Sequence, residues 1–207
     1  MKYELLDWIE YKKLKPSYLS LNINAISFLE KHPEMIDWDS LSSNPKAIRI
    51  LLKNLDKVNW KAFSRNPKAI KILSENLDKI DYENLSLNTN PKAIEILKNN
   101  IKKIDWYNLC SHTKNMNFLL ENEENIKWNK LSLNPNAIKV LKNNKEKIKW
   151  NLLSLNPKAI KLLSNNLDKI DWTLLSNNPN AIKILPLNKI DWNEISRNPN
   201  AIEILMQ

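Results

Sequence analysis

The sequence of 207 residues contains no glycine, one cysteine and two histidines. Without glycine, the chain cannot form the glycine-rich loops that hold phosphate groups in many nucleotide-binding enzymes. The single cysteine, Cys110, excludes an intrachain disulfide and suits a reducing compartment. Because the usual ligand groups are so few, we expect the protein to hold neither a cofactor nor a metal ion.

The few reactive side chains are explained by an internal repeat. Cys110 and His112 lie two residues apart, which leaves a thiol protease as an alternative, but no orienting third group or oxyanion donor accompanies them. His32 and His112 stand where other copies of the repeat have asparagine, and Cys110 stands where they have serine. We therefore predict no catalytic residues and a protein that is not an enzyme.

Arginine is scarce too, although the formal net charge is +9. Only Arg49, Arg65 and Arg197 are present, whereas readers of base sequence favour arginine for its two-pronged hydrogen bonding. Lysine, asparagine and isoleucine all have A/T-rich codons, so coding bias accounts for much of the basic character. Lysine nevertheless recurs at one repeat position and predicts a one-sided stripe, either a solvated face or a phosphate-binding track: Lys57, Lys79, Lys103, Lys147, Lys169 and Lys189.

Long apolar segments are also missing. No stretch approaches the ~18 apolar residues of a membrane-spanning helix. The opening MKYELLDWIE lacks the apolar core of a secretory signal. We expect no membrane contact and a cytoplasmic location.

What the chain does have is a repeat of 22 residues, seen by aligning NPKAIKILSENLDKIDYENLSL (66–87) with NPKAIKLLSNNLDKIDWTLLSN (156–177). Degenerate copies start at Asn22-Ile23 and His112-Thr113, and seven Asn-Pro pairs are intact, at 44–45, 66–67, 90–91, 134–135, 156–157, 178–179 and 198–199. An aromatic ladder keeps the phase, except for an insertion near Thr89-Asn90 and a shortening after Asn188: Trp38, Trp60, Tyr82, Trp106, Trp128, Trp150, Trp172 and Trp192. Such a period is typical of a solenoid, in which each unit buries its apolar face against its neighbours.

Each unit reads as two short helices. Asn-Pro predicts a helix start, with asparagine as N-cap and proline at the first helical position. Because glycine is absent, the asparagines at 54, 76, 100, 122, 144, 166 and 188 are expected to end that helix in the left-handed conformation. A residue such as Asp37 before each aromatic is expected to cap the second helix, although Lys127 and Lys149 stand there in two copies. The alternative is a leucine-rich repeat with Ile-Asp-Trp as a short parallel strand.

We therefore predict an all-α fold, a right-handed α-solenoid of about nine helix-turn-helix repeats in a single domain, residues 1–207. Residues 1–20, with the amphipathic LLDWIEYKKL, are expected to form an N-terminal helical cap, and the repeats to occupy 21–207. At the other end the sequence stops at Leu205-Met206-Gln207, inside a first helix. Its uncovered apolar end is expected to permit self-association.

Candidate binding residues follow from where the repeat varies. Once core, cap and turn positions are set aside, variation concentrates at the two positions after each aromatic residue, which is where repeat proteins place recognition. Drift at unconstrained surface sites is the alternative. The candidates for partner binding are Asp39, Ser40, Lys61, Glu83, Asn84, Tyr107, Asn108, Asn129, Lys130, Asn151, Thr173, Asn193 and Glu194.

The stretch from Asn88 to Leu120 is the least regular part of the array, because it holds the insertion and lacks one Asn-Pro pair. We expect it to be a bend or a soft joint. Restoring the repeat with His112→Asn and Thr113→Pro is expected to raise stability by about 1 kcal/mol.

Written as NPxAIxLLxxNxxKIDWxxLSxNP, the repeat resembles that of the short Asn-Pro repeat proteins that giant DNA viruses of protists encode in many copies. The resemblance covers residues 20–207 and rests on the paired NPxAI and IDWxxLS blocks. It implies a viral protein in the host cytoplasm or virion, but no particular activity. The expected function is a non-enzymatic scaffold that binds host or viral proteins. The alternative is sequence-independent nucleic-acid binding through the lysines.

Overall fold

The computed structural model describes residues 9–10, 13–202 and 206. Within this part of the chain all regular structure is helical, so the predicted all-α repeat solenoid is confirmed. The leucine-rich alternative is wrong, because the Ile-Asp-Trp segments of the described residues form no strands and lead directly into helices. The helix expected over LLDWIEYKKL lies largely outside the described residues.

One set of helices, here called the aromatic helices, begins at the ladder residues. These are α3 (Trp38–Ser43), α5 (Trp60–Arg65), α7 (Tyr82–Leu85), α9 (Trp106–His112), α11 (Trp128–Leu133), α13 (Trp150–Ser154), α15 (Trp172–Ser176) and α16 (Trp192–Ile195). The helix α1 (Pro16–Leu21) holds the corresponding place before α3. The repeat therefore already begins within the segment expected to be the N-terminal cap.

The other set, here called the alternate helices, lies between them in sequence. It consists of α2 (Ile26–Lys31), α4 (Ile48–Leu52), α6 (Ile70–Ser74), α8 (Ala93–Lys98), α10 (Met116–Leu120), α12 (Ile138–Asn143) and α14 (Ile160–Ser164). Each is followed by a single 3₁₀ turn: η2 (Pro33–Met35), η3 (Leu55–Lys57), η4 (Leu77–Lys79), η5 (Ile101–Lys103), η6 (Glu123–Asn125), η7 (Lys145–Lys147) and η8 (Leu167–Lys169). In the last full repeat, two 3₁₀ turns replace helix and turn, η9 (Ile182–Ile184) and η10 (Leu187–Lys189).

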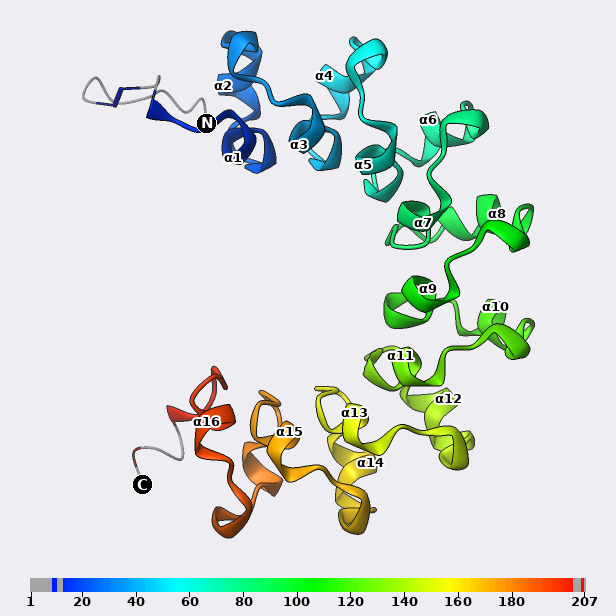
Figure 1. The fold of residues 1–207 in the computed structure, drawn as a ribbon, viewed down its shortest axis with the longest axis vertical. Helices are drawn as coiled ribbons and strands as arrows, with labels where there is room; N and C mark the ends of the chain where they lie inside the picture. Colours follow the sequence, from blue (N-terminus) through cyan, green and yellow to red (C-terminus); the bar gives the residue numbers. More distant parts are fainter. Residues whose placement is uncertain (1–8, 11–12, 203–205, 207) are drawn as a thin grey trace. The chain divides into compact units, whose positions relative to one another are not determined.

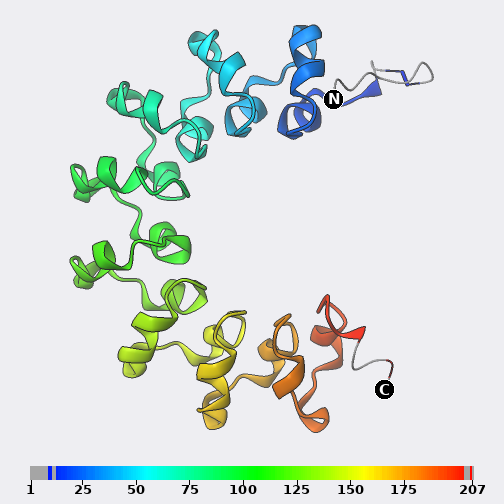
Figure 2. The ribbon, with the colours of Figure 1, turned by 180° about the vertical axis from the view of Figure 1, so that it is seen from behind.

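The helices form two compact units, Met1–Asp105 and Trp106–Gln207. In the first unit α1, α3, α5 and α7 pack side by side in one row, with the alternate helices in a second row (Figure 1). In the second unit α9, α11, α13, α15 and α16 form the corresponding row (Figure 2). Each unit thus has a face made of aromatic helices.

The core of each unit lies between its two rows. The fourth residue of every aromatic helix is buried: Leu41, Phe63, Leu85, Leu109, Leu131, Leu153, Leu175 and Ile195. The alanine before or at the start of an alternate helix is buried as well, which lets the two rows approach closely: Ala25, Ala47, Ala69, Ala93, Ala137, Ala159 and Ala181. Burying apolar surface between short helices in this way supplies most of the stability of such arrays.

In every repeat with an intact Asn-Pro pair, a buried asparagine joins the repeat to the one before it. Asn66 is 1 % exposed. Its Nδ2 donates to the carbonyls of Ser42 (3.0 Å) and Asn44 (3.1 Å), one repeat back. Its Oδ1 accepts the backbone N–H of Lys68 at 3.0 Å, which closes the turn at Pro67. The residues in this position, here called the ladder asparagines, are Asn44, Asn66, Asn88, Asn134, Asn156, Asn178 and Asn198.

The prediction that these asparagines are helix N-caps is therefore wrong. Asn44 follows the last residue of α3, and α4 begins only at Ile48, after a turn, with Ala47 at the capping position. The side chain of Asn44 accepts from Lys46 within that turn rather than from a helix. Buried polar groups need partners, and here the partners belong mainly to the preceding repeat.

The ladder also locates the insertion in the first unit. Asn88, not the Asn90 of the intact Asn-Pro pair, donates to the carbonyls of Ser64 and Asn66. Asn90 instead bonds the carbonyl of Pro67 at 2.7 Å. The two additional residues therefore enlarge the turn and leave the ladder intact.

A second link runs through the serine next to the buried leucine. Ser42 is buried; its hydroxyl donates to the carbonyl of Trp38 (2.7 Å) and accepts the N–H of Asn59 (3.0 Å) in the following repeat. Cys110 replaces this serine, and its sulfur accepts the N–H of Lys127 at 3.4 Å. The substitution is thus structural, as expected, but the cysteine also forms a link that the sequence did not reveal.

The predicted caps of the aromatic helices are confirmed where the side chain permits. The side chains of five capping residues accept a backbone N–H at the start of the helix: Asp37, Asn59, Asp81, Asp171 and Asp191. Lys127 and Lys149 form no such side-chain bond, yet α11 and α13 are present. The cap therefore assists these helices without being required.

The predicted left-handed helix ends are wrong. Asn54 has φ −141° and ψ 50°, and no described residue has a positive φ. Its Nδ2 instead donates to the carbonyl of Ile50 at 2.9 Å, four residues back. The same bond recurs at Asn76, Asn100, Asn122, Asn144 and Asn166. The asparagine side chain thus bonds a carbonyl at the end of the helix. In a glycine-capped helix, a backbone N–H would bond such a carbonyl instead. Asn188 lies inside η10, because the shortened repeat displaces it.

In the irregular copy at residues 112–115, local hydrogen bonds replace those of the missing Asn-Pro turn. The Thr113 hydroxyl accepts the N–H of Asn115 (3.1 Å), and Asn115 caps α10 through the N–H of Phe118 (3.1 Å). The backbone N–H of Thr113 donates to the carbonyl of Leu109 at 3.1 Å. Proline at 113 removes both the hydroxyl and that N–H, so the expected gain in stability does not follow.

We predict that replacing Asn156 with alanine lowers the free energy of unfolding by about 2–4 kcal/mol, because two carbonyls and one N–H lose their buried partner. Asn156→Asp should cost more, because it buries a carboxylate against carbonyl oxygens. Urea unfolding measures both. Asn165→Ala, an exposed asparagine after α14, is the control and should change stability by less than about 0.5 kcal/mol. Equal effects at 156 and 165 would contradict the ladder.

We also predict that Thr113→Pro destabilises the protein by about 2–3 kcal/mol, since it removes a helical hydrogen bond and the hydroxyl acceptor. Thr113→Ser, which keeps both groups, is the matched control and should lose less. Thermal unfolding of the three proteins compares them. A higher melting temperature for the proline variant would show that restoring the repeat matters more than these two bonds.

Candidate partner-binding surface

The aromatic ladder is half-buried rather than fully enclosed. Trp38, Trp60 and the other ladder residues up to Trp172 are partly accessible, and Trp192 is 59 % exposed. A lysine of the next repeat lies over five of these rings, with its Nζ 4.6–5.1 Å from the ring centroid: Lys57 on Trp38, Lys79 on Trp60, Lys103 on Tyr82, Lys147 on Trp128 and Lys169 on Trp150. Burial raises the pKa of the Tyr82 phenol.

These contacts give the lysines of the stripe a structural role. A lysine at this distance from a ring face is attracted by the ring's quadrupole and contributes about 0.5–1 kcal/mol at an exposed site. Five of the six stripe lysines therefore have a packing role between repeats. Their recurrence does not require a phosphate-binding track.

The first residue after each aromatic lies on the accessible side of its helix. Seven of these are exposed: Asp39, Lys61, Glu83, Tyr107, Asn151, Thr173 and Asn193. Asn129 is half-buried, and its Oδ1 accepts the N–H of Lys130 at 2.9 Å. The structure places these candidates on the aromatic face, one per helix, within each unit.

The second candidate position is less available. Ser40, Asn84, Asn108, Lys130 and Glu194 are all half-buried. Several have structural contacts. The N–H of Ser40 donates to Asp37, the amide of Asn84 donates to Asp81, and Lys130 lies 4.1 Å over the ring of Tyr107. This position therefore contributes more to the frame than to the surface.

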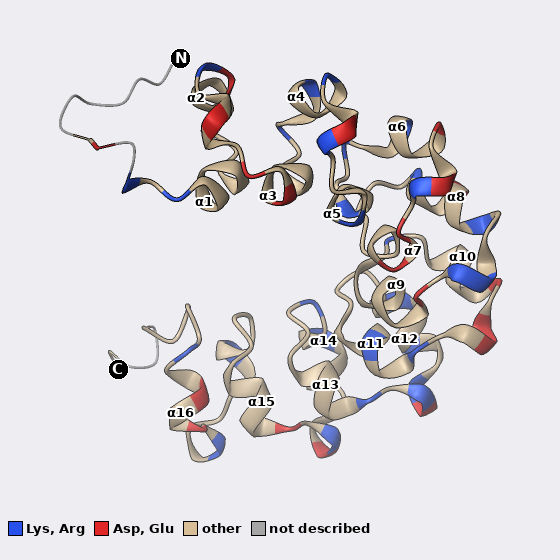
Figure 3. Ribbon diagram, turned by 45° about the horizontal axis from the view of Figure 1, so that its top comes forward, with Lys and Arg blue, Asp and Glu red and all other residues tan. Residues whose placement is uncertain are grey.

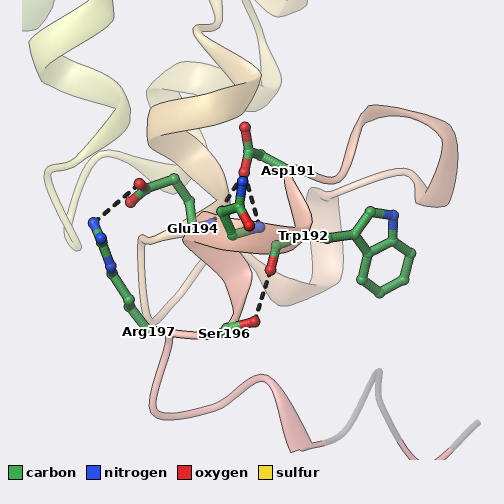
Figure 4. A network of polar contacts seen from close by, with 6 residues as sticks. Asp191, Trp192, Glu194, Ser196 and Arg197 are labelled. Atoms are coloured by element: carbon green, nitrogen blue, oxygen red, sulfur yellow. Dashed lines mark hydrogen bonds and ion pairs between the residues drawn. The ribbon is translucent and has the colours of Figure 1, made fainter.

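The last repeat shows the second position in detail (Figure 4). Asp191 accepts the backbone N–H groups of Asn193 and Glu194, and Ser196 donates to the carbonyl of Trp192 at 2.7 Å. The Glu194 carboxylate pairs with Arg197 at 3.1 Å. The ring of Trp192 points away from these hydrogen bonds and is exposed, while its carbonyl takes part in them. Glu194 is thus engaged within its own helix and turn.

Sequence reasoning missed a further surface position, the fifth residue after each ladder aromatic, here called the fifth position, which lies in the last turn of the longer aromatic helices or just after the shorter ones. It lies next to the first position on the same outer side of a helix, since residues four apart share a face. Its residues differ from copy to copy and immediately precede the repeat's conserved turn: Ser43, Arg65, Leu87, Ser111, Leu133, Leu155, Asn177 and Arg197. That variation was visible in the sequence, but the position was set aside together with the core, cap and turn positions.

The two units differ in the chemistry of this face. In the first unit the first position holds Asp39, Lys61 and Glu83, all charged. In the second it holds only uncharged residues: Tyr107, Asn129, Asn151, Thr173 and Asn193. Charged and uncharged surfaces attract different partners, so the two faces are not equivalent.

The structure gives less support to sites elsewhere in the described part of the chain. Cys110 is fully buried, while His112 is half-buried with its Nδ1 3.2 Å from the Ser111 hydroxyl. A cavity of about 380 Å³ lies among α2, α4 and η3, where Arg49 pairs with Glu30 at 2.7 Å. No group of three or more histidine, cysteine or acidic side chains in the described part of the chain could hold a metal ion. Nor is any of the described helices long and apolar enough to cross a membrane.

At the C-terminal end, the segment expected to self-associate lies mostly outside the described residues. Of its described neighbours, Leu187, Trp192, Ile202 and Met206 are exposed apolar side chains.

Comparison with known proteins gives no relative from which a site can be transferred: no family model, curated protein or solved structure matches this chain.

Proposed function

We propose that the protein is a non-enzymatic scaffold that binds other proteins through the aromatic face. The observation that supports it is the contrast between a fixed frame and a varied surface. Ladder asparagines, link serines and capping residues recur from repeat to repeat, whereas the exposed first position changes from Asp39 to Lys61 to Glu83. In repeat proteins such a pattern accompanies recognition.

The contacts of the lysines favour a protein partner over nucleic acid. Binding to a phosphate backbone needs several cations free to replace counterions. Here Lys57, Lys79 and Lys103 lie over rings of the preceding repeat, and in the copy after Trp106 the corresponding sequence position holds Asn125 instead of lysine. The face that varies carries few of the chain's lysines.

The resemblance of the repeat to those of giant DNA viruses gives the proposal a setting. We propose that the chain is a viral protein acting in the cytoplasm of an infected protist or in the virion, with host or viral proteins as partners. The described apolar side chains near the C-terminus, Trp192 and Ile202 among them, add self-association to the proposed contacts.

The test is affinity capture from a protist host lysate with a variant that replaces seven exposed residues of the aromatic face with alanine. They are Asp39, Lys61, Glu83, Tyr107, Asn151, Thr173 and Asn193. A control variant removes the same number of acidic and basic groups from exposed positions on or beside the alternate helices, again to alanine: Lys68, Glu75, Glu95, Asn99, Leu120, Asn143 and Asn165. We expect the first variant to lose specific partners that the wild type and the control both retain.

Identical partners for all three proteins would overturn the proposed surface. A gel-shift titration with DNA and RNA at about 50 mM salt examines the alternative function. We expect no shift there. A shift that weakens steeply with added salt would favour nucleic acid instead.

A further inference from the structure

We propose that the second unit binds an extended, uncharged polypeptide segment along α11, α13 and α15. This inference rests on the proposed function and specifies the partner's chemistry. The binding residues are those at the first and fifth positions after the aromatics that begin these three helices. They are here called the amide strip: Asn129, Leu133, Asn151, Leu155, Thr173 and Asn177.

The six residues of the amide strip carry no charge. Charged residues make up 27 % of the sequence, yet α13 and α15 contain none (Figure 3). The one charged residue of α11, Lys130, lies over the Tyr107 ring. Surfaces of helical repeats are normally covered with charged residues that keep them solvated. An uncharged strip over three successive helices therefore suits an uncharged partner.

The side chains of the strip match a peptide backbone. Asparagine offers two N–H donors and a carbonyl acceptor, the same groups that a peptide unit presents in return. Within the described part of the chain the exposed side chains of Asn151 and Thr173 form no hydrogen bond, so they are available to a partner. Leu133 and Leu155 are half-buried beside them and give apolar contact area.

The spacing of the strip suits an extended segment. Helices packed side by side lie about 8–10 Å apart. A polyproline-II segment rises about 3.1 Å per residue with three residues per turn, so it presents the same face about every 9 Å. One first-position side chain per helix, Asn129, Asn151 or Thr173, therefore meets an equivalent backbone group at each step. A β-strand repeats its faces every two residues, about 7 Å, and falls out of step.

Other occupants fit less well. A nucleic acid would need cations, and the amide strip has none. An acidic peptide would find its complement in the lysines elsewhere on the chain. A polyproline-II segment keeps its backbone groups free of internal hydrogen bonds, so it can give them to the strip. About six residues of such a segment span the distance from α11 to α15.

The experiment is selection from a phage-displayed library of random linear peptides about twelve residues long, on the full chain. Enriched peptides are synthesised, and their affinities are measured by fluorescence anisotropy. Two variants test the site, Asn151→Ala combined with Thr173→Ala, and Leu155→Asp. Asn165→Ala, an exposed asparagine beside α14, is the control. Circular dichroism and urea unfolding establish that each variant is folded.

We expect enriched peptides to be largely uncharged, with preferred residues recurring every three positions. Both strip variants should bind them at least about tenfold more weakly, while the control binds as the wild type does. No enrichment, enrichment of acidic peptides, or equal binding by the strip variants would overturn the inference. If lysate partners still depend on the aromatic face in that case, the proposed scaffold function stands and only its peptide partner is wrong. If lysate partners do not depend on the aromatic face either, both the proposed scaffold function and the peptide inference are wrong.

Discussion

The buried ladder asparagine is the interaction on which the rest of this structure depends. Its amide bonds two carbonyls of the preceding repeat and its carbonyl closes the turn of its own repeat, as at Asn156. Short helices of five or six residues have little stability of their own, so such links fix where each begins relative to its neighbour. The same side chain type ends the alternate helices, as at Asn54. Together these bonds explain how the chain turns repeatedly without glycine and without a positive φ in its described part.

The ladder also separates the positions that are constrained from those that are free. A ladder asparagine and a serine such as Ser42 each have hydrogen-bond partners in two repeats, and substituting one leaves a buried group unpaired. Truncating a buried leucine such as Leu41 leaves a cavity. The first and fifth positions after the aromatic have fewer such contacts, although Asp39 accepts a hydrogen bond from the side chain of Asn59 in the next repeat at 2.7 Å. The stripe lysines belong to the constrained set, because they lie over aromatic rings. Function is therefore to be sought on the face that the ladder leaves free.

The repeat, its helical nature and the Asp37-type caps could be predicted from the sequence, because a period of 22 and an acidic residue before an aromatic helix are local patterns. The role of Asn44 could not, since Asn-Pro suits a helix start and a turn equally, and only its contact with Ser20, 24 residues back, decides. Asn88 was overlooked for Asn90 for the same reason. Variation between copies identified Lys61 and Thr173, and the structure shows both to be exposed. Leu155 and Asn177 were missed because their position, directly before the Asn-Pro pair, was set aside with the turns.

The central claim, that buried asparagine amides hold the repeats in register, is tested most directly by hydrogen exchange of asparagine side-chain NH₂ groups, followed by NMR. The ladder amides of Asn134, Asn156 and Asn178 each donate to two buried carbonyls, while Asn151 and Asn165 are exposed. The account predicts that the ladder amides exchange only when the repeats open, as slowly as the backbone N–H groups of Leu153 or Leu175. Ladder amides that exchange as fast as those of Asn151 and Asn165 would contradict it.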